Sequence, residues 1–295
     1  MLPSERSGFV AILGQPNAGK STLTNLFVGS KVSIVSRKVQ TTRVKTLGIV
    51  IKDQTQIILL DTPGIFTPQK TLEKSIVNNA IRTIDEADTI VLLVDLSFKD
   101  YQTSLDILKK LPKNKSVFLV FNKIDKCQDL DKDNILCQFE ELYKFDGVFW
   151  ISALKGEGTE LLLNALCLKM PYHPWLYPED IITDQPEAVW AAEIVREQVY
   201  QQLHEELPYE IYIEPESFER FDNGSIKICQ AVVVARDGQK GIVLGHKGSR
   251  IKKIGMTARA ILEEEMGCRV HLKLFVKVTE NWMEKSSNLK EQKLI

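Results

Sequence analysis

The segment GQPNAGKS at residues 14–21 constrains the fold of this 295-residue chain more than any other stretch. It has the form G-x-x-x-x-G-K-[ST], a loop whose backbone N–H groups wrap around phosphate oxygens. An uninterrupted apolar run at residues 9–13 precedes it, and a helical pattern at 20–27 follows it. A buried strand, a glycine-containing loop and a helix in this order predict an α/β domain whose first helix points its N-terminus at a bound phosphate.

Short apolar runs without a polar interruption alternate with helical patterns as far as residue 170. The runs cover residues 9–13, 57–60, 90–94, 117–121 and 148–151, and the helical patterns cover 20–27, 73–86, 104–111, 132–145 and 158–170. Strands of this kind are covered on both faces. The pattern therefore predicts an α/β fold with a doubly wound, mostly parallel sheet and helices on either side.

The second half of the chain follows a stretch with three prolines. Residues 170–184 carry Pro171, Pro174 and Pro178 and few charges, which is typical of a semi-rigid linker. A smaller α+β domain is predicted after it. It is expected to begin with a helix at 187–207, followed by strands at 209–219 and 224–235 that an Asp-Asn-Gly turn joins. Two helices around a glycine-containing loop follow, the second at 249–266, and a strand at 269–278 ends the domain. The predicted division is one domain at 1–170, a linker at 171–186, a second domain at 187–282 and a tail at 283–295.

Composition narrows the class of protein. The five cysteines are odd in number and never in C-x-x-C spacing, which argues against a disulfide framework or a zinc site and indicates a reducing, cytoplasmic environment. No apolar run is long enough to span a membrane, and the N-terminal MLPSERSG lacks the apolar region of a secretory signal. The net charge of −1 excludes no partner, because patches of opposite sign can cancel.

The glycine-containing loop predicts the phosphate contacts. Gly14 and Gly19 let the backbone approach closely, Lys20 is expected to bridge the β- and γ-phosphates, and the Ser21 hydroxyl is expected to ligate Mg²⁺. Lys20 and Ser21 are therefore also predicted catalytic residues. The other predicted nucleotide-binding residues of this stretch are Gln15, Pro16, Asn17, Ala18 and Thr22.

A second apolar run ends at Asp61-Thr62-Pro63-Gly64. Alone, this sequence would be an ordinary tight turn, because Pro and Gly are common turn residues. Placed after a buried strand and after the phosphate loop, Asp61 is expected to hold the metal through water. Gly64 is expected to offer its N–H to the γ-phosphate, which makes it a predicted catalytic residue and makes the following segment a sensor of the nucleotide.

Two further apolar runs are followed by NKID at 122–125 and by Ser152-Ala153, at the strand ends where open parallel sheets bind ligands. Asp125 can accept hydrogen bonds from the N1–H and the exocyclic amine that only guanine presents together. Asn122 is expected to reach the O6/N7 edge, Lys123 to cover one face of the base, and the Ser152-Ala153 backbone to place an N–H near O6. The motifs together predict a pocket for GTP and GDP.

Residues 38–43, KVQTTR, lie where a first nucleotide-sensing loop belongs. One threonine hydroxyl is expected to complete the Mg²⁺ shell, and Thr42 is preferred over Thr41 because it directly precedes the arginine. Ile65 stands where Ras-type enzymes carry a glutamine that orients water. Since isoleucine cannot orient water, hydrolysis is expected to be slow or to use another device. The candidate device is Asn17, whose amide oxygen is placed to ligate K⁺ beside the phosphates.

The second half contains two G-x-x-G matches, one at 238–241 and one at Gly245-His246-Lys247-Gly248. About one such match arises by chance in a chain with sixteen glycines, so the spacing alone is weak. The second match is preferred because apolar residues flank it as two helices packed on a sheet would. Its two glycines then let the backbone approach nucleic-acid phosphates, while His246 and Lys247 face outward.

Seven basic residues and one acid, Asp237, stand between residues 236 and 259. A solvated helix face would carry intervening acids, so the excess predicts a surface for a phosphate backbone. The predicted RNA-binding residues are Gly245, His246, Lys247, Gly248, Arg250, Lys252 and Lys253. Part of the apolar stripe of the strand at 224–235 is expected to line a cleft for the bases.

The order GQPNAGKS, QTTR, DTPG, NKID and SA, followed by GHKG, resembles the bacterial Era family of ribosome-assembly GTPases, in which a TrmE-Era-type P-loop domain precedes a type II KH domain. The resemblance covers the chain to about Trp282. It implies a GTP-hydrolysing switch that uses Mg²⁺, binds the 3′ end of 16S rRNA and assists maturation of the 30S ribosomal subunit. It also implies a monomer in the cytoplasm, and peripheral attachment to the inner membrane rests on the resemblance alone.

Two other functions remain open from the sequence. An RNA-binding chaperone with a structural, barely hydrolysed nucleotide is compatible with Ile65. A tRNA-modification GTPase shares the loop asparagine, Asn17, but it needs substrate machinery for which this chain has room only in the KH-like domain. Stimulation of GTP hydrolysis by RNA distinguishes the switch from the chaperone.

Overall fold

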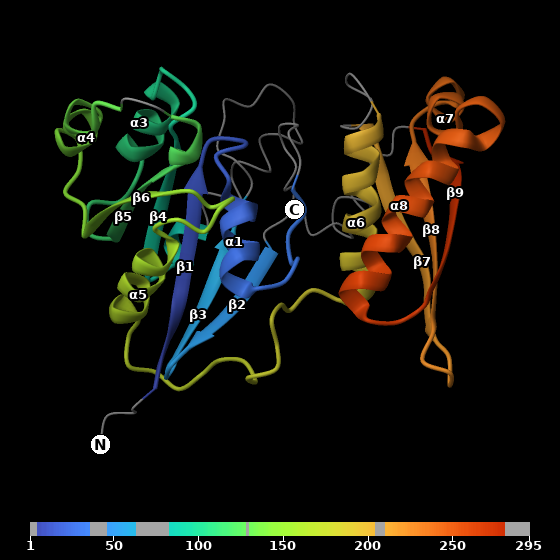
Figure 1. Ribbon diagram of the computed structural model, residues 1–295, viewed down its shortest axis with the longest axis horizontal. Helices are drawn as coiled ribbons and strands as arrows, with labels where there is room; N and C mark the ends of the chain where they lie inside the picture. The colour runs from blue at the N-terminus through green and yellow to red at the C-terminus, as the bar shows by residue number, and fades with distance from the viewer. Residues whose placement is uncertain (1–4, 36–45, 63–82, 128–129, 204–209, 281–295) are drawn as a thin grey trace. The chain divides into compact units, whose positions relative to one another are not determined.

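The computed structural model describes residues 5–35, 46–62, 83–127, 130–203 and 210–280. The chain divides into two compact units (Figure 1). The first unit consists of Met1–Ser33 and Val39–Asp184, and the second of Ile34–Lys38 and Gln185–Ile295.

The first unit is built on a six-stranded sheet with the strand order β2-β3-β1-β4-β5-β6. The strands are β1 (Arg6–Gly14), β2 (Thr46–Lys52), β3 (Thr55–Asp61), β4 (Thr89–Asp95), β5 (Ser116–Asn122) and β6 (Gly147–Ile151). Every neighbouring pair is parallel except β2 and β3, which are antiparallel. The predicted mostly parallel α/β sheet is therefore confirmed.

Successive residues of β1 point to opposite faces of the sheet and enter two separate cores. Val10 shares one core with Leu23 and Leu162, and Ala11 shares the other with Ile107 and Phe139. Helices α1 (Lys20–Val28) and α5 (Thr159–Lys169) thus cover one face, and α3 (Gln102–Lys109) and α4 (Lys132–Glu140) cover the other (Figure 1). This is the doubly wound arrangement expected of strands buried on both sides.

Two strands at the sheet edges differ from the sequence-based expectation. β2 is not among the five predicted strands, and it pairs with the sheet on one side only. β6 is the opposite edge, so Val148, Phe149 and Trp150 are half-buried rather than covered on both faces. Trp150 instead stacks on Phe121, with ring centroids 4.2 Å apart.

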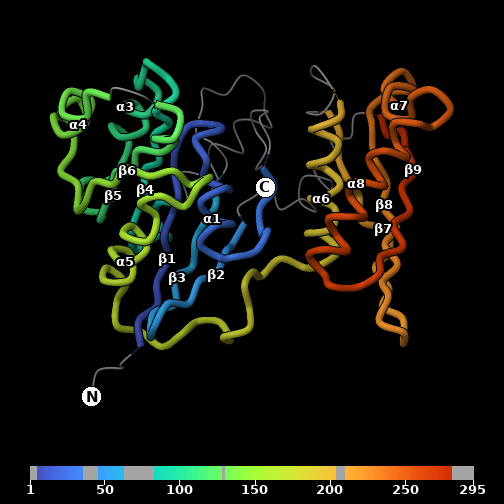
Figure 2. The backbone as a smooth tube through the Cα atoms, in the orientation of Figure 1, coloured from blue at the N-terminus to red at the C-terminus, as the bar shows by residue number. Residues whose placement is uncertain are grey.

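The segment at 170–184, predicted as a linker, lies along the first unit (Figure 2). The Ser7 N–H donates to Pro171 O at 3.2 Å, and the Ile49 N–H donates to Ile182 O at 2.8 Å. The Gln56 side chain accepts from the backbone N–H of Tyr177 at 3.0 Å. Hydrogen bonds with β1, β2 and β3 therefore hold this segment in place.

The second unit has the element order α-β-β-α-α-β. Its elements are α6 (Glu187–Gln202), β7 (Tyr212–Arg220), β8 (Ile226–Val234), α7 (Asp237–Leu244), α8 (Ser249–Met266) and β9 (Val270–Val278). In the sheet, β8 pairs antiparallel with β7 and parallel with β9. The expected smaller α+β domain is present, and the G-x-x-G match at 238–241 lies inside α7.

The second unit has its own apolar core. Ile254, Ala258 and Leu262 repeat at four-residue intervals along α8 and are fully buried in the same core as Val232 of β8. Ile34 also belongs to this core, although it is far from the domain in sequence.

Candidate functional site

The loop between β1 and α1 has a backbone that only glycine fits at two positions. Gly14 has φ 152° and Gly19 has φ 103°. A Cβ on Gly14 would lie 2.4 Å from Leu93 O, and one on Gly19 would lie 2.3 Å from Asn122 Nδ2. The glycines thus keep the loop backbone free of side chains where α1 begins, which is the arrangement of a phosphate site.

Lys20 is buried at the start of α1. Its Nζ donates to Gly14 O at 3.2 Å and to Gln15 O at 3.0 Å, so it lies against the loop. Burial lowers the pKa of Lys20 to about 8, and the nearby Asp61 carboxylate only partly opposes this effect. A phosphate anion would supply the counter-charge that burial makes favourable. Pro16, Asn17 and Ala18 lie between Gly14 and the start of α1, and Thr22 lies in the first turn of that helix.

Asp61 ends β3 as a fully buried carboxylate. Burial raises its pKa, while the Ser21 hydroxyl, the Lys20 ammonium and the Ser33 hydroxyl lie close enough to favour the ionised form. Neither carboxylate oxygen has a completed hydrogen bond among the described residues. A dry carboxylate beside a hydroxyl fits a Mg²⁺ ion, since Mg²⁺ takes hard oxygen ligands. Ser21 and Asp61 are thus suited to hold the ion.

Several predicted residues of the phosphate site lie outside the described residues. These are Thr42, Pro63 and Gly64, together with the alternative Thr41 and the isoleucine at 65. Thr62 is described, and its hydroxyl donates to Ile12 O at 2.7 Å. Thr62 therefore fastens the end of β3 to β1 from a buried position.

Asn122 joins the phosphate loop to the base-recognition segments. Its Nδ2 donates to Ala18 O at 2.7 Å, and its Oδ1 accepts from the Ala153 N–H at 2.9 Å. The Ser152 N–H donates to Glu157 O at 3.0 Å. The Asn122 amide and the two backbone N–H groups thus form hydrogen bonds within the protein, and the contact of these residues with the edge of a base stays a prediction.

Lys123 is held by Asp95, which belongs to none of the sequence motifs. Its Nζ donates to Asn17 O at 2.7 Å and forms an ion pair with the buried carboxylate of Asp95. Asp95 also accepts from the backbone N–H and the hydroxyl of Ser97. Asp95 could have been predicted from its position at the end of β4, because it directly follows an apolar run and lies at the same sheet edge as the other motifs.

Asp125 lies in a 3₁₀ turn, Ile124–Lys126, at the same edge of the sheet. Its Oδ1 accepts from the Ser152 hydroxyl at 2.7 Å, and that hydroxyl in turn accepts from the Lys155 N–H at 3.2 Å. The hydrogen bond fixes one carboxylate oxygen and therefore sets the direction of the other. The recognition of guanine by Asp125 stays a prediction.

The preferred G-x-x-G match forms the junction of α7 and α8. Gly245 has φ 69° and Gly248 has φ 77°, and His246 and Lys247 are exposed between them, as expected. Arg250 donates from Nη1 to Ile242 O at 2.6 Å, so it fastens α8 to α7. A Cβ on Gly245 would lie 2.8 Å from the Arg250 Cβ, whereas a Cβ on Gly248 would meet no atom within 4 Å.

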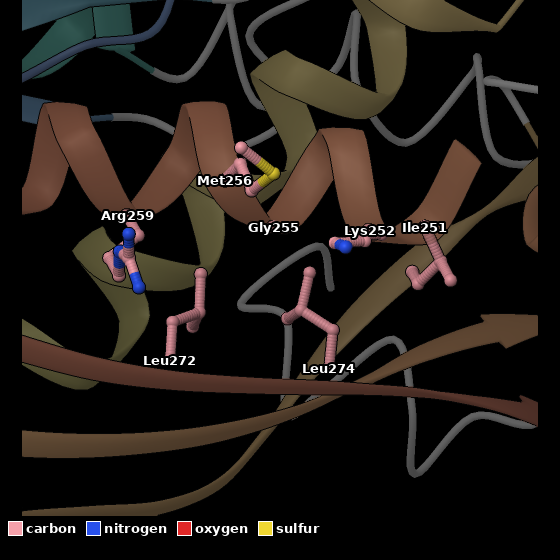
Figure 3. A pocket seen from close by; sticks show the side chains of 7 residues that line it. All are labelled: Ile251, Lys252, Gly255, Met256, Arg259, Leu272 and Leu274. Carbon is pink, nitrogen blue, oxygen red and sulfur yellow. The ribbon is translucent and has the colours of Figure 1, made fainter. Parts of the chain in front are cut away.

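A cleft of about 250 Å³ lies between α8 and β9 (Figure 3). It is lined by Ile251, Lys252, Gly255, Met256, Arg259, Leu272 and Leu274. Only Lys252 was predicted, and the cleft lies on β9 rather than on the predicted stripe of β8. Lys252, Met256 and Arg259 stand on one exposed helix face at three- and four-residue spacing, which is a pattern that could have revealed them.

Neither a membrane-spanning helix nor a cluster of metal-binding side chains is found in the described part of the chain. No helix there is long and apolar enough to cross a membrane. No three His, Cys, Asp or Glu side chains are grouped there in a way that could hold a metal ion.

Two family profiles match the two halves of the chain. Residues 9–123 match the 50S ribosome-binding GTPase family, and residues 206–283 match the KH domain family. The chain is 45% identical to GTPase Era of Erythrobacter litoralis over 97% of its own length and 96% of that protein. It is 47% identical to GTPase Era of Brucella suis over 94% of its length and 89% of that protein.

Solved structures agree with these relatives over both units. The chain is similar to a crystal structure of Era in complex with MgGDPNP and nucleotides 1506–1542 of 16S ribosomal RNA, with 38% identity, a TM-score of 0.88 and coverage of 97% of this chain and 98% of that one. It is equally similar to a single-residue variant of Aquifex aeolicus Era bound to GDP·AlF4⁻, with the same identity, TM-score and coverage.

Asp125→Asn is expected to exchange guanine for xanthine preference. The carbonyl of the introduced asparagine can keep the Ser152 hydrogen bond, which turns its amide N–H₂ toward the C2 oxygen of xanthine. GDP affinity is expected to fall about 10- to 100-fold, the effect of losing hydrogen bonds to a charged group, while XDP affinity rises. Fluorescence titration with both nucleotides measures this, with Asp125→Ala as the control that loses both. Unchanged guanine selectivity would contradict the role of Asp125.

The lowered pKa of Lys20 predicts that nucleotide affinity depends on pH. Its pKa of about 8 belongs to the nucleotide-free pocket, and a bound phosphate favours the ammonium form. Binding therefore takes up a proton above pH 8, so GDP affinity is full below that pH and falls by at most about tenfold per pH unit above it. Calorimetric titration at pH 7, 8 and 9 measures the effect. Lys20→Met is expected to bind weakly and to lack this slope, and an identical slope in the variant would exclude Lys20 as its source.

Proposed function

The chain belongs to the Era family of GTPases, and from that premise we propose that it is a GTP-hydrolysing switch that binds the 3′ end of 16S rRNA and assists assembly of the 30S ribosomal subunit. The observation that carries the proposal is the pairing, in one chain, of a nucleotide pocket with a G-x-x-G junction beside a cleft. The proposed functional domains are those predicted from the sequence, at 1–170 and 187–282.

Different loops of the nucleotide pocket bind the phosphates, the base and the metal ion. The backbone at Gly14 and Gly19 and the Lys20 ammonium bind the phosphates of GTP or GDP, and Asp125 reads the base. Ser21 and Asp61 hold Mg²⁺, with Thr42 as the proposed further ligand. The ion supplies positive charge at the phosphates, while the loop backbone and Lys20 orient the γ-phosphate for attack by water.

Asn17 is the proposed ligand for K⁺. It adopts a left-handed backbone conformation, φ 63°, within the phosphate loop, and its carbonyl oxygen accepts from Lys123. A cation at its side chain would supply the charge that an arginine supplies in other GTPases. GTP hydrolysis is expected to be about tenfold faster or more in K⁺ than in Na⁺ buffer. Asn17→Ala is expected to remove the difference, and equal wild-type rates in the two buffers would remove K⁺ from the mechanism.

RNA binding is assigned to the second unit. The backbone at Gly245 and Gly248 approaches the phosphates, and the predicted basic side chains, His246, Lys247, Arg250, Lys252 and Lys253, surround them. The cleft adds an apolar wall of Leu272 and Leu274 against which unstacked bases can pack. Arg259 and Lys252 stand at the same cleft as cations (Figure 3). Single-stranded RNA is the ligand that uses both features at once.

The oligomeric state and the location of the protein are also part of the proposal. A monomer in the cytoplasm is the proposed form, and peripheral attachment to the inner membrane is carried by the family resemblance alone. An RNA chaperone with a structural nucleotide stays the alternative, since it would use the same pocket and the same cleft.

RNA is expected to stimulate GTP hydrolysis only when the G-x-x-G junction is intact. Gly248→Asp adds a negative charge that repels RNA, at a position where no atom lies within 4 Å but where φ of 77° strains any side chain, so thermal unfolding is measured beside it. The variant is expected to lose the stimulation by an oligonucleotide of the 16S rRNA 3′ end and to keep the basal rate. The matched control is Gly241→Asp in the other G-x-x-G match, which is equally uncrowded and should keep most of the stimulation. Wild-type protein that binds the RNA tightly without any stimulation would favour the chaperone.

A further inference from the structure

Asp95 is a buried carboxylate at the end of β4 that belongs to no part of the proposed GTP chemistry. None of its surface is exposed. Its Oδ1 accepts from the Ser97 N–H at 2.9 Å and from the Ser97 hydroxyl at 2.6 Å, and its Oδ2 forms an ion pair with the Lys123 Nζ. Each carboxylate oxygen therefore has its own partner, and the two sets of hydrogen bonds fix the side chain in one orientation.

The Lys123 ammonium connects Asp95 to the phosphate loop. It donates to Asn17 O at 2.7 Å as well as to the Asp95 carboxylate, and the lysine side chain is 21% exposed. Lys123 also has a left-handed backbone, φ 71°, which is uncommon for a residue with a side chain. Such a conformation persists where the surroundings hold it in place. The lysine is therefore held at its backbone and at its tip.

The segments that carry the two residues are joined by further hydrogen bonds. The Leu96 N–H donates to Asn122 O at 3.1 Å, and the Cys127 thiol donates to Leu96 O at 3.3 Å. β4 and β5 are adjacent and parallel, with Asp95 beside Asn122 (Figure 1). Asp95 thus reaches Lys123 from a fixed backbone, and the ion pair is in place before a nucleotide binds.

A second lysine–aspartate pair in the first unit allows a comparison. Lys169 Nζ and Asp146 Oδ1 lie 2.6 Å apart, but their side chains are 41% and 33% exposed. Exposed pairs contribute little, because water competes for both charges. The Asp95 carboxylate is fully buried, so the loss of either partner leaves an uncompensated charge in a dry site. Lys123 is therefore bound to its partner more strictly than a surface lysine.

We propose that Asp95 is a positioning residue of the nucleotide pocket, which locks Lys123 to the phosphate loop and thereby slows the release of GTP and GDP. This inference rests on the proposed function, because it concerns the lysine that is expected to cover the base. Asp95 contacts neither base nor phosphate in the proposed arrangement. It acts through Lys123, whose stem stays over the base while its ammonium is held by Asp95 and by Asn17 O.

The test measures the release rate of a fluorescent GDP analogue from the full chain. Asp95→Asn is expected to release it about tenfold faster, since one amide oxygen cannot accept from both Ser97 and Lys123. Lys123→Met is expected to have a similar effect. The double variant is expected to stay within about twofold of Lys123→Met, because Asp95 acts only through the lysine. The matched control, Asp146→Asn, breaks an exposed pair and is expected to leave release unchanged.

Thermal unfolding separates this role from a general loss of structure. Lys123→Met leaves a buried carboxylate without its cation, and Asp95→Asn in the same chain removes that charge. The double variant is therefore expected to unfold at a higher temperature than Lys123→Met, although it releases the analogue equally fast. Ser97→Ala keeps both charges and frees only one carboxylate oxygen, so it is expected to speed release about threefold.

Two results would overturn the role of Asp95. One is release from Asp95→Asn within about twofold of the wild type, since Lys123 would then not need the carboxylate. The other is a double variant whose effect is the product of the two single effects, because Asp95 would then act independently of Lys123. If Asp95→Asn does not fold, unchanged release from Ser97→Ala overturns the role instead. A wild type that does not retain the GDP analogue would contradict the proposed function itself, which is a distinct outcome.

Discussion

The nucleotide pocket depends on the Asn122 amide more than on any other single interaction. That side chain ends β5 and reaches in two directions, to Ala18 O in the phosphate loop and to the Ala153 N–H after β6. It is buried, so both hydrogen bonds form in a dry environment where an unpaired amide would be costly. Lys123 adds a parallel bridge from the next residue to Asn17 O and Asp95. The loops that bind phosphate and base are therefore one connected structure, placed at one sheet edge by parallel strands.

The sequence predicted those features that depend on a short local pattern of residues. Apolar runs predicted five of the six strands of the first sheet, and glycine spacing predicted the loop geometry at Gly14 and Gly245, because these features depend on neighbouring residues alone. Asp95 was missed because its role appears only when β4 and β5 lie side by side and bring it to Lys123. The place of Ile34 in the second core could not be read from its neighbours either, since residues far away in the chain supply its contacts.

The same limit applies to the proposed RNA site. The glycines and lysines of the junction stand out in the sequence, whereas Met256 and Leu274 resemble any other apolar residues until α8 is laid over β9 and leaves a cleft between them (Figure 3). The hydrogen bond between Asn122 and Ala153 also joins two segments that their motifs leave separate. A motif fixes which groups gather at a site, but the hydrogen bonds those groups make with one another decide which of them remain for the ligand.

A chain that couples nucleotide state to RNA binding has different RNA affinities in its two nucleotide states, and linkage requires RNA to change the relative affinities for GTP and GDP by the same factor. The most direct test is the affinity of a 16S rRNA 3′-end oligonucleotide for the protein loaded with GDP and for the protein loaded with a non-hydrolysable GTP analogue. We expect binding to be about tenfold tighter with the GTP analogue, within the usual range of coupling between two sites. Equal affinities in the two states would contradict the switch and leave an RNA-binding protein whose nucleotide serves its structure.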